Sequence, residues 1–222
     1  MAKKVLELNV DFKEQSKSGG KGSFSLQPLE RGYGTTIGNA MRRVLLTSIP
    51  GAAITHVKID GVQHEFSTID GVKEDVADII MNLKKVRFKL MDNAPDKVTL
   101  SIKGKKSFTA QDIQNASDQF EVLNPEEYIT EVNSKGKLDI ELRIGIGKGY
   151  VPSEANDMPN LPVGTLSIDS IFNPVTNVTF NVQPVPGAKD PIEILSLDVT
   201  TDGSITAKDA VSYTATYLRE HF

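Results

Sequence analysis

The sequence has 222 residues, enough for one large domain or two modest domains with hydrophobic cores of their own. Its 25 basic and 29 acidic residues leave a formal net charge of -4, so no global positive field can hold a polyanion such as DNA. Cysteine is absent, which excludes disulfides, thiolate zinc sites, iron–sulfur clusters and a cysteine nucleophile.

The amino-terminal segment predicts a β-hairpin followed by a helix. Alternating apolar residues indicate strands at 5–10 and 23–27, with a loop-forming cluster at 16–22 between them. Apolar residues then recur at helical spacing, which predicts an amphipathic helix over 35–49, capped by Thr35 or Thr36, that ends before Pro50. The apolar run at the start is short and alternating, and no stretch of roughly 18 apolar residues occurs, so we expect a cytoplasmic protein without a membrane span.

The next segment predicts a second hairpin and a second helix. Residues 53–59 and 62–66 have strand patterns, and Asp60-Gly61 between them is typical of a tight turn. Val72, Val76, Ile79, Ile80 and Leu83 share one helical face. Thr68 or Asp70 is the expected cap of that helix.

The remainder of the chain is largely β in pattern and ends in a helix over 207–222. Strands are predicted at 98–102, 138–146, 163–168, 175–182 and 192–200. The segment 147–163 interrupts this pattern with three prolines and few periodic apolar positions. Irregular excursions of this kind often contact a partner.

Three glycines precede and begin the first helix, in the segment 30–46, which reads ERGYGTTIGNAMRRVLL. A dinucleotide-binding loop needs G-x-G-x-x-G after a buried strand, whereas Gly32, Gly34 and Gly38 give G-x-G-x-x-x-G. A P-loop is also excluded, because no Lys-Ser or Lys-Thr pair follows the last glycine. We therefore interpret the glycines as structural, allowing backbone turns and a close approach of the helix.

No other pattern indicates catalysis, a metal ion or a cofactor. The three histidines, His56, His64 and His221, lack the spacing that would place two metal ligands on one helix face. No G-x-S-x-G motif occurs, and no triad can be assigned. An acidic cluster is better explained by a turn, a strand and the first turn of a helix than by a metal ion; it comprises Asp60, Glu65, Asp70, Glu74 and Asp75.

The arginine pair Arg42-Arg43, flanked by Arg31 and Asn39, lies at or beside the apolar face of the first helix and could simply be its solvated side. Residues 30–84 nevertheless closely resemble the amino-terminal domain of bacterial RNA polymerase alpha subunits. The family signature runs ERG-x-G-x-T-x-GNA-x-RR-x-LL-x-S-x-PG, then IDGV-x-HE-(FY)-ST, then GV-x-ED. GKGYVPSE, DSIFNPV and TDGSI follow in the family's order, so the resemblance covers essentially the whole chain.

The resemblance implies an α+β fold of two domains. A dimerisation domain would be formed from both chain ends, residues 1–50 and 175–222, and a mostly β domain would be inserted at 51–174. The chain would be a homodimer in which the first and last helices meet their copies across a twofold axis. The residues expected at this interface are Ile37, Met41, Val44, Leu45, Tyr217 and Leu218.

The function that the resemblance implies is assembly of DNA-directed RNA polymerase, a nucleotidyltransferase whose catalytic centre lies in its larger subunits. One copy of the dimer would bind the beta subunit and the other the beta-prime subunit. The residues expected to dock beta are Arg31, Gly32, Asn39, Arg42 and Arg43. Lys84 and Ile168 match family positions tied to beta-prime binding.

Two other classes of function remain open on the sequence. One is a nucleotide-dependent enzyme that uses the glycine loop, and the other is a free-standing DNA-binding protein that uses the arginines. Most bacterial alpha subunits continue into a DNA-binding carboxy-terminal domain, whereas this sequence stops at Phe222. We therefore expect no direct DNA binding from it.

Overall fold

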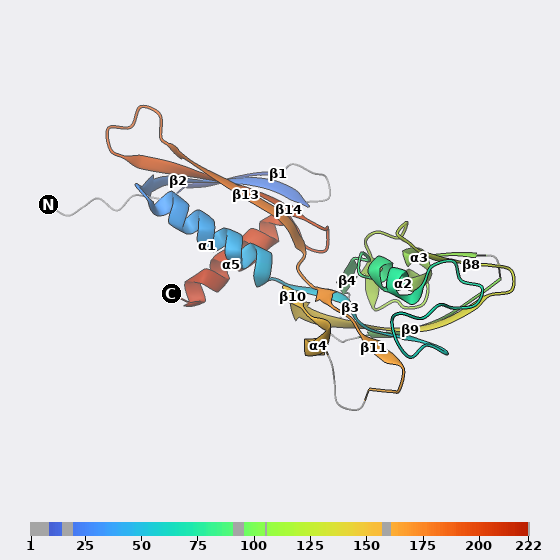
Figure 1. Ribbon diagram of the computed structural model, residues 1–222. Helices are drawn as coiled ribbons and strands as arrows, with labels where there is room; N and C mark the ends of the chain where they lie inside the picture. The colour runs from blue at the N-terminus through green and yellow to red at the C-terminus, as the bar shows by residue number, and fades with distance from the viewer. Residues whose placement is uncertain (1–8, 15–19, 91–95, 105, 157–160, 222) are drawn as a thin grey trace. The chain divides into compact units, whose positions relative to one another are not determined.

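The computed structural model describes residues 9–14, 20–90, 96–104, 106–156 and 161–221. The chain divides into two compact units (Figure 1). Unit 1 combines Met1–Ile49 with Asn173–Phe222, and unit 2 is Pro50–Phe172. The mixture of helices and strands confirms the predicted α+β class.

Unit 1 is a four-stranded antiparallel sheet covered on one face by two helices, which cross each other (Figure 1). The strand order is β1-β2-β14-β13, so strands from the two ends of the chain pair at the centre of the sheet. Its elements are β1 (Asn9–Glu14), β2 (Lys21–Glu30), α1 (Tyr33–Thr47), β13 (Val175–Pro184), β14 (Ile192–Thr201) and α5 (Ala207–His221).

The glycines of α1 set how closely this helix lies against the sheet. A Cβ atom on Gly38 would lie 2.5 Å from the Phe180 ring, and one on Gly34 would lie 2.6 Å from Val182 Cγ1. Both partners belong to β13, so the glycines allow the helix to pack directly on that strand. The first helix and the structural interpretation of its glycines are confirmed, but the predicted cap at Thr35 or Thr36 is wrong, because the helix begins at Tyr33 and its N-cap residue is Gly32.

Unit 2 is built around a larger antiparallel sheet with the strand order β5-β9-β3-β4-β7, in which β11 also pairs with β3. Two small sheets, β10-β12 and β6-β8, accompany it. Its elements are β3 (Pro50–Ile59), α2 (Val76–Leu83), β4 (Phe88–Leu90), β5 (Asp96–Lys103), β6 (Lys106–Thr109), α3 (Ala110–Gln114), β7 (Phe120–Val122), β8 (Tyr128–Val132), β9 (Lys137–Lys148), β10 (Tyr150–Val151), α4 (Ser153–Asn156), β11 (Thr165–Ser167) and β12 (Ser170–Ile171).

The alternation predicted for residues 138–146 is the clearest strand signal in unit 2, and β9 confirms it. Leu138, Ile140, Leu142 and Ile144 are all buried in one core, while their neighbours along the strand are partly exposed. Alternation of this kind is expected where one face of a strand is buried and the other is not.

Two predictions were wrong in detail. Residues 62–66 form turns rather than a strand, where His64 O accepts a hydrogen bond from Ser67 N. The second helix begins later than its apolar pattern suggested, and its cap is Asp75, whose side chain accepts from Asp78 N at 2.8 Å. The first predicted strand, 5–10, lies mostly outside the described residues, although β1 does form a hairpin with β2.

Replacing Gly38 by alanine tests the close packing of α1. In an exposed helix the change would stabilise by about 1 kcal/mol, because alanine is the better helix former. Here we expect lower stability, by about 1 to 3 kcal/mol, because the new methyl group overpacks against Phe180. Thermal unfolding of Gly38→Ala, with exposed Thr35→Ala as the control on the same helix, measures the effect.

A second substitution makes the test specific. Phe180→Leu in the Gly38→Ala background should recover part of the loss, because the smaller side chain leaves room for the methyl group. A Gly38→Ala variant more stable than the parent would contradict the packing argument.

Candidate docking surfaces

The first candidate surface consists of the exposed side of α1 and the two residues before it, which together include every residue expected to dock the beta subunit. Arg31, Gly32, Asn39, Arg42 and Arg43 are all exposed. Positions 39, 42 and 43 share one helix face, because residues three and four apart are neighbours on a helix. None of the three arginine side chains has a hydrogen bond or an ion pair with another described residue. The surface therefore presents guanidinium donors that are not used inside the chain.

The glycine loop before α1 binds an acid of its own chain. Gly32, the N-cap residue, has a φ of 90° and no side chain to cap the helix. The carboxylate of Glu193, from β14, accepts from Gly32 N at 3.0 Å and from Gly34 N at 3.1 Å. Amide groups that could have held a phosphate are thus already paired.

The expected dimer residues divide into two groups. Met41 and Leu45 are buried inside the core of unit 1, Leu45 with no exposed area, so their side chains cannot form a surface for a second chain. This corrects the expectation for these two residues: helical periodicity identifies an apolar face but not what covers it. Ile37, Val44, Tyr217 and Leu218 are half-buried and remain accessible. The Tyr217 ring stacks on His221, at 4.1 Å between ring centroids.

The second candidate surface surrounds the end of α2. Lys84, the C-cap residue, places its Nζ 2.8 Å from Asp169 Oδ2. This hydrogen bond and the lysine charge outweigh partial burial and hold the pKa of Asp169 below its usual range. Ile168 is buried in the core of unit 2, so its side chain is not available to a partner, and Asp169 beside it is the surface residue. This corrects the expectation for Ile168.

Two exposed apolar side chains accompany this ion pair. Tyr150 and Ile171 face each other across the β10-β12 pair and are 62% and 43% exposed. A hydrogen bond from Tyr150 also helps to lower the pKa of Asp169. Arg87 Nη1 donates to Ile171 O at 3.2 Å. Periodicity along the chain could not predict this cluster, because it joins short strands with residues more than 60 positions away.

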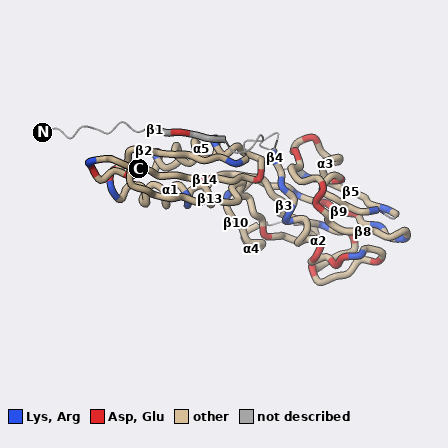
Figure 2. The backbone as a smooth tube through the Cα atoms, turned by 90° about the horizontal axis from the view of Figure 1, so that it is seen from above, with Lys and Arg blue, Asp and Glu red and all other residues tan. Residues whose placement is uncertain are grey.

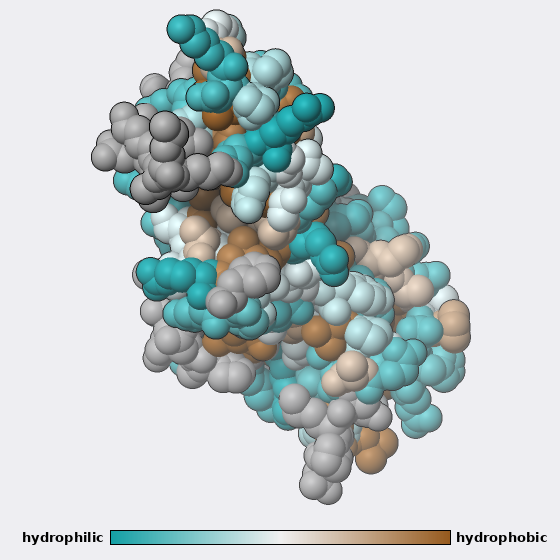
Figure 3. Space-filling model, turned by 90° about the vertical axis from the view of Figure 1, so that its left-hand side faces the viewer, coloured by the Kyte–Doolittle hydropathy of each residue, from teal (hydrophilic) through white to brown (hydrophobic). Residues whose placement is uncertain are grey.

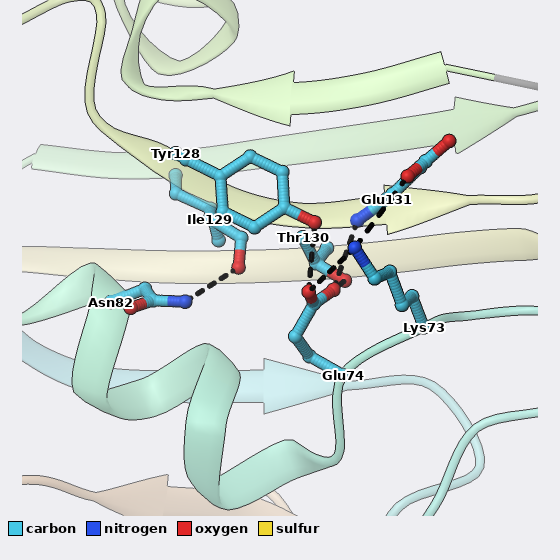
Figure 4. A network of polar contacts seen from close by, with 7 residues as sticks. All are labelled: Lys73, Glu74, Asn82, Tyr128, Ile129, Thr130 and Glu131. Atoms are coloured by element: carbon cyan, nitrogen blue, oxygen red, sulfur yellow. Dashed lines mark hydrogen bonds and ion pairs between the residues drawn. The ribbon is translucent and has the colours of Figure 1, made fainter.

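The acidic cluster contains a structural carboxylate, Glu74, at the entrance to α2 (Figure 4). Its oxygens accept from Tyr128 Oη at 2.8 Å, Thr130 Oγ1 at 2.7 Å and Glu131 N at 3.1 Å. The Lys73 ammonium lies 4.0 Å from the same carboxylate. These contacts bind the segment before α2 to β8.

The protonation of this network follows from its contacts. Burial alone would raise the pKa of Glu74, but the hydrogen bonds from Thr130, Tyr128 and Glu131 N, aided by Lys73, leave it lowered. For Tyr128, burial and then the hydrogen bond to Glu74 raise the pKa to about 12. The network is therefore an ionised carboxylate held by neutral and cationic donors.

The remaining titratable residues are dispersed over the described part of the chain. His56 is buried, with its Nε2 2.9 Å from Asn156 O, while His64 is within hydrogen-bond distance of Ser67 Oγ and His221 of Tyr217 O. No group of three or more His, Cys, Asp or Glu side chains among the described residues is placed to hold a metal ion.

Both units carry acidic and basic residues (Figure 2). In the described ranges, no helix is long and apolar enough to span a membrane.

The described residues thus define a two-unit α+β protein with an arginine-bearing helix surface on one unit and a lysine–aspartate surface on the other. A family model described as the RNA polymerase Rpb3/RpoA insert domain matches residues 57–173, most of unit 2. A protein from Chlorobaculum tepidum named DNA-directed RNA polymerase subunit alpha is 51% identical over 213 residues, which are 96% of this chain and 65% of that protein.

Two further relatives bear the same name. The protein from Chloroherpeton thalassium is 50% identical over 97% of this chain and 65% of its own length. The protein from Salinibacter ruber is 48% identical over 100% of this chain and 68% of its own length. The chain therefore belongs to the family of DNA-directed RNA polymerase alpha subunits. It spans about 65% of the length of the first two relatives.

The Glu74 network yields a pH-dependent prediction. Glu74→Gln should destabilise unit 2 by about 1 to 3 kcal/mol at neutral pH, because hydrogen bonds to a charged group are lost or weakened. The folded-state pKa of Glu74 is lowered, so its stabilisation is present above the unfolded-state pKa and is lost as the pH falls through the folded-state pKa. The difference between variant and parent should therefore vanish in acid, measured by urea unfolding from neutral to acidic pH.

Glu126→Gln is the matched control, because Glu126 is exposed and has no hydrogen bond or ion pair with a described residue. It should match the parent at every pH. Equal stability of Glu74→Gln and the parent at neutral pH, or a deficit that persists unchanged in acid, would refute the assigned role.

Proposed function

We propose that this chain acts as a non-catalytic alpha subunit of DNA-directed RNA polymerase, a homodimeric cytoplasmic scaffold that binds the beta and beta-prime subunits for transcription. The observation that carries the proposal is the set of exposed, unpaired arginines on α1 in a chain of this family. No residue of the chain is assigned a catalytic, metal-binding or cofactor-binding role.

The arginine surface has the chemistry of a protein interface. Arginine offers a planar fork of donors that pairs with carboxylates and carbonyls, and it is enriched among residues that dominate binding energy. Arg42 and Arg43 make no ion pair with the described residues of their own chain, so a partner carboxylate would not have to displace one. We assign this surface, with Arg31, Gly32 and Asn39, to the beta subunit.

The second surface is the proposed site for beta-prime. We assign Lys84 and Asp169 to this site. Asp169 replaces Ile168, because the side chain of Ile168 is buried. Exposed Tyr150 and Ile171 add apolar area, and amphipathic aromatic side chains are frequent at interface centres.

The proposed dimer interface uses the half-buried apolar residues Ile37, Val44, Tyr217 and Leu218. They come from α1 and α5, the two helices that cover one face of the unit 1 sheet. Hydrophobic side chains reach the surface in patches between hydrophilic ones on the face drawn in Figure 3. A twofold axis would bring the same residues of two chains together.

The two other classes of function have less support. A nucleotide would have to compete with Glu193 for the amides of Gly32 and Gly34. A free-standing DNA-binding protein would need a basic surface, whereas the net charge is -4.

The test of the proposed function is capture of partners by the tagged chain from its native cell, where two very large subunits should be recovered. Arg43→Ala should reduce capture of beta by about 30-fold or more, because truncating one member of a buried charge pair typically costs about 2 to 5 kcal/mol. Its melting behaviour should match the parent, since most surface substitutions change stability by no more than about 0.5 kcal/mol. Arg43→Lys should restore binding only in part, because lysine lacks the planar fork.

Lys208→Ala serves as the control, an exposed cation on α5 outside the proposed docking set. It should bind beta as the parent does. Recovery of no large subunit by the parent would overturn the proposal, and normal beta binding by Arg43→Ala would remove Arg43 from the interface.

The homodimer is tested separately by sedimentation of the purified chain at micromolar concentration, where the parent should be a dimer. Val44→Glu should give a folded monomer, because a charge buried without a partner is costly. Leu45→Glu on the same helix is the contrast: Leu45 is fully buried within one chain, so this variant should unfold. A monomeric parent, or an unchanged dimer for Val44→Glu, would refute the proposed interface.

A further inference from the structure

Glu193 occupies a position where the strand pattern calls for an apolar residue. In β14, Leu195, Leu197 and Val199 are buried, Leu197 and Val199 in a core shared with α1 and α5, while Ser196 and Asp198 are exposed. Side chains two apart along a strand share a face, so position 193 belongs to the helix-covered face. Glu193 is half-buried at this position, so its carboxylate loses part of its contact with water, which costs free energy unless the oxygens are hydrogen-bonded.

The cost is offset by the two hydrogen bonds to the start of α1. Each oxygen of Glu193 accepts from a different amide, Gly32 N at 3.0 Å and Gly34 N at 3.1 Å. A negative charge at the positive end of a helix dipole is also favourable. The carboxylate supplies, from 161 residues away, the cap that Gly32 cannot provide.

The sequence of the loop is fitted to this carboxylate. A Cβ on Gly34 would lie 2.9 Å from Glu193 Oε2, so a larger residue at position 34 would crowd it. Gly32 has a φ of 90°, a conformation that glycine adopts without strain. Arg31 and Glu193 both line one surface cavity of about 330 Å³, together with Pro184 and Pro191.

We propose that Glu193 is a positioning residue for the beta-docking surface: its two hydrogen bonds fix the glycine loop and thereby set Arg31 and Gly32 in place before a partner binds. This inference rests on the proposed function. A surface that is ordered in advance binds more tightly, because apparent affinity scales with the fraction of molecules in the competent conformation. The beta-docking surface would then be complete only when β14, from the far end of the chain, has joined the sheet.

The experiment compares the parent chain with Glu193→Ala and Glu193→Gln. Hydrogen exchange at the Gly32 and Gly34 amides should be about 5- to 30-fold faster in Glu193→Ala, the range expected when a cap of typical strength is lost. Beta capture should weaken by more than twofold and at most by about the same factor as amide exchange accelerates. Glu193→Gln should lie between the two, because it keeps an acceptor oxygen without the charge.

Asp198→Asn is the matched control. Asp198 lies on the same strand, is exposed and accepts a hydrogen bond from Ser23 Oγ on β2, remote from the start of α1. It should leave both exchange and beta capture at the parent's values. Because a purely structural role would affect the whole unit, all variants should also be dimeric by sedimentation.

The possible failures are distinct. If Glu193→Ala keeps the parent's amide exchange, Glu193 does not fix the loop. If exchange accelerates but beta capture is unchanged within twofold, or if the dimer is lost, the positioning role is refuted. If the parent itself captures no beta subunit, the proposed function fails, and with it this inference.

Discussion

The close approach of α1 to β13 is the constraint on which the organisation of unit 1 depends. Gly38 has no room for a methyl group beside Phe180, so the helix can reach this depth only with glycine there. At this depth Leu45 and Ile49 are buried under the helix in the common core. The same orientation places Arg43 on the opposite side of the helix and leaves Arg42 exposed at the flank of the packed face. Packing on one face of the helix therefore decides which residues the other face can offer to a partner.

The pairing of β2 with β14 is the second constraint, because it joins segments separated by most of the chain. The entropy of closing a loop grows only slowly with its length, so inserting a folded unit between the two segments adds little cost. Unit 2 has a core of its own, as an insertion of this kind requires. Glu193 connects this sheet to the start of α1, since its carboxylate on the paired strand β14 accepts from Gly32 N and Gly34 N.

Sequence patterns predicted the helices and strands in which apolar residues recur at a regular spacing. The spacing of apolar residues located α1, α5 and β9, because each packs one face against a core. The pattern could not say what lies against that face, which is why Leu45 was expected between chains although it is buried within one. The predicted strand at 62–66 failed because a short alternation competed with local turn hydrogen bonds.

Local sequence patterns could not predict contacts between residues that are far apart along the chain. The sequence predicted a cap at Thr35 or Thr36, but α1 begins at Tyr33 and its cap comes from Glu193, in a proline-rich neighbourhood far along the chain. Glu74 could be explained as an acid near a helix start, but its three hydrogen-bond donors lie more than 50 residues away on β8. Such residues are visible only once strands and helices have been placed beside one another.

The two candidate surfaces differ in whether their charged side chains are already paired within the chain. This difference helps to explain how two identical chains could bind different partners. The arginines of α1 have no ion pair with described residues, so a partner carboxylate there adds a charge pair and can be attracted over a distance. Lys84 already pairs with Asp169, so a partner must either accommodate this ion pair or replace one of its members. Binding there would therefore depend more on shape complementarity to the exposed side chains of Tyr150 and Ile171. The proposed dimer would carry each surface twice. Two partners of different chemistry could then bind different surfaces on the two copies, so that a symmetric scaffold supports an asymmetric assembly without any difference between its chains.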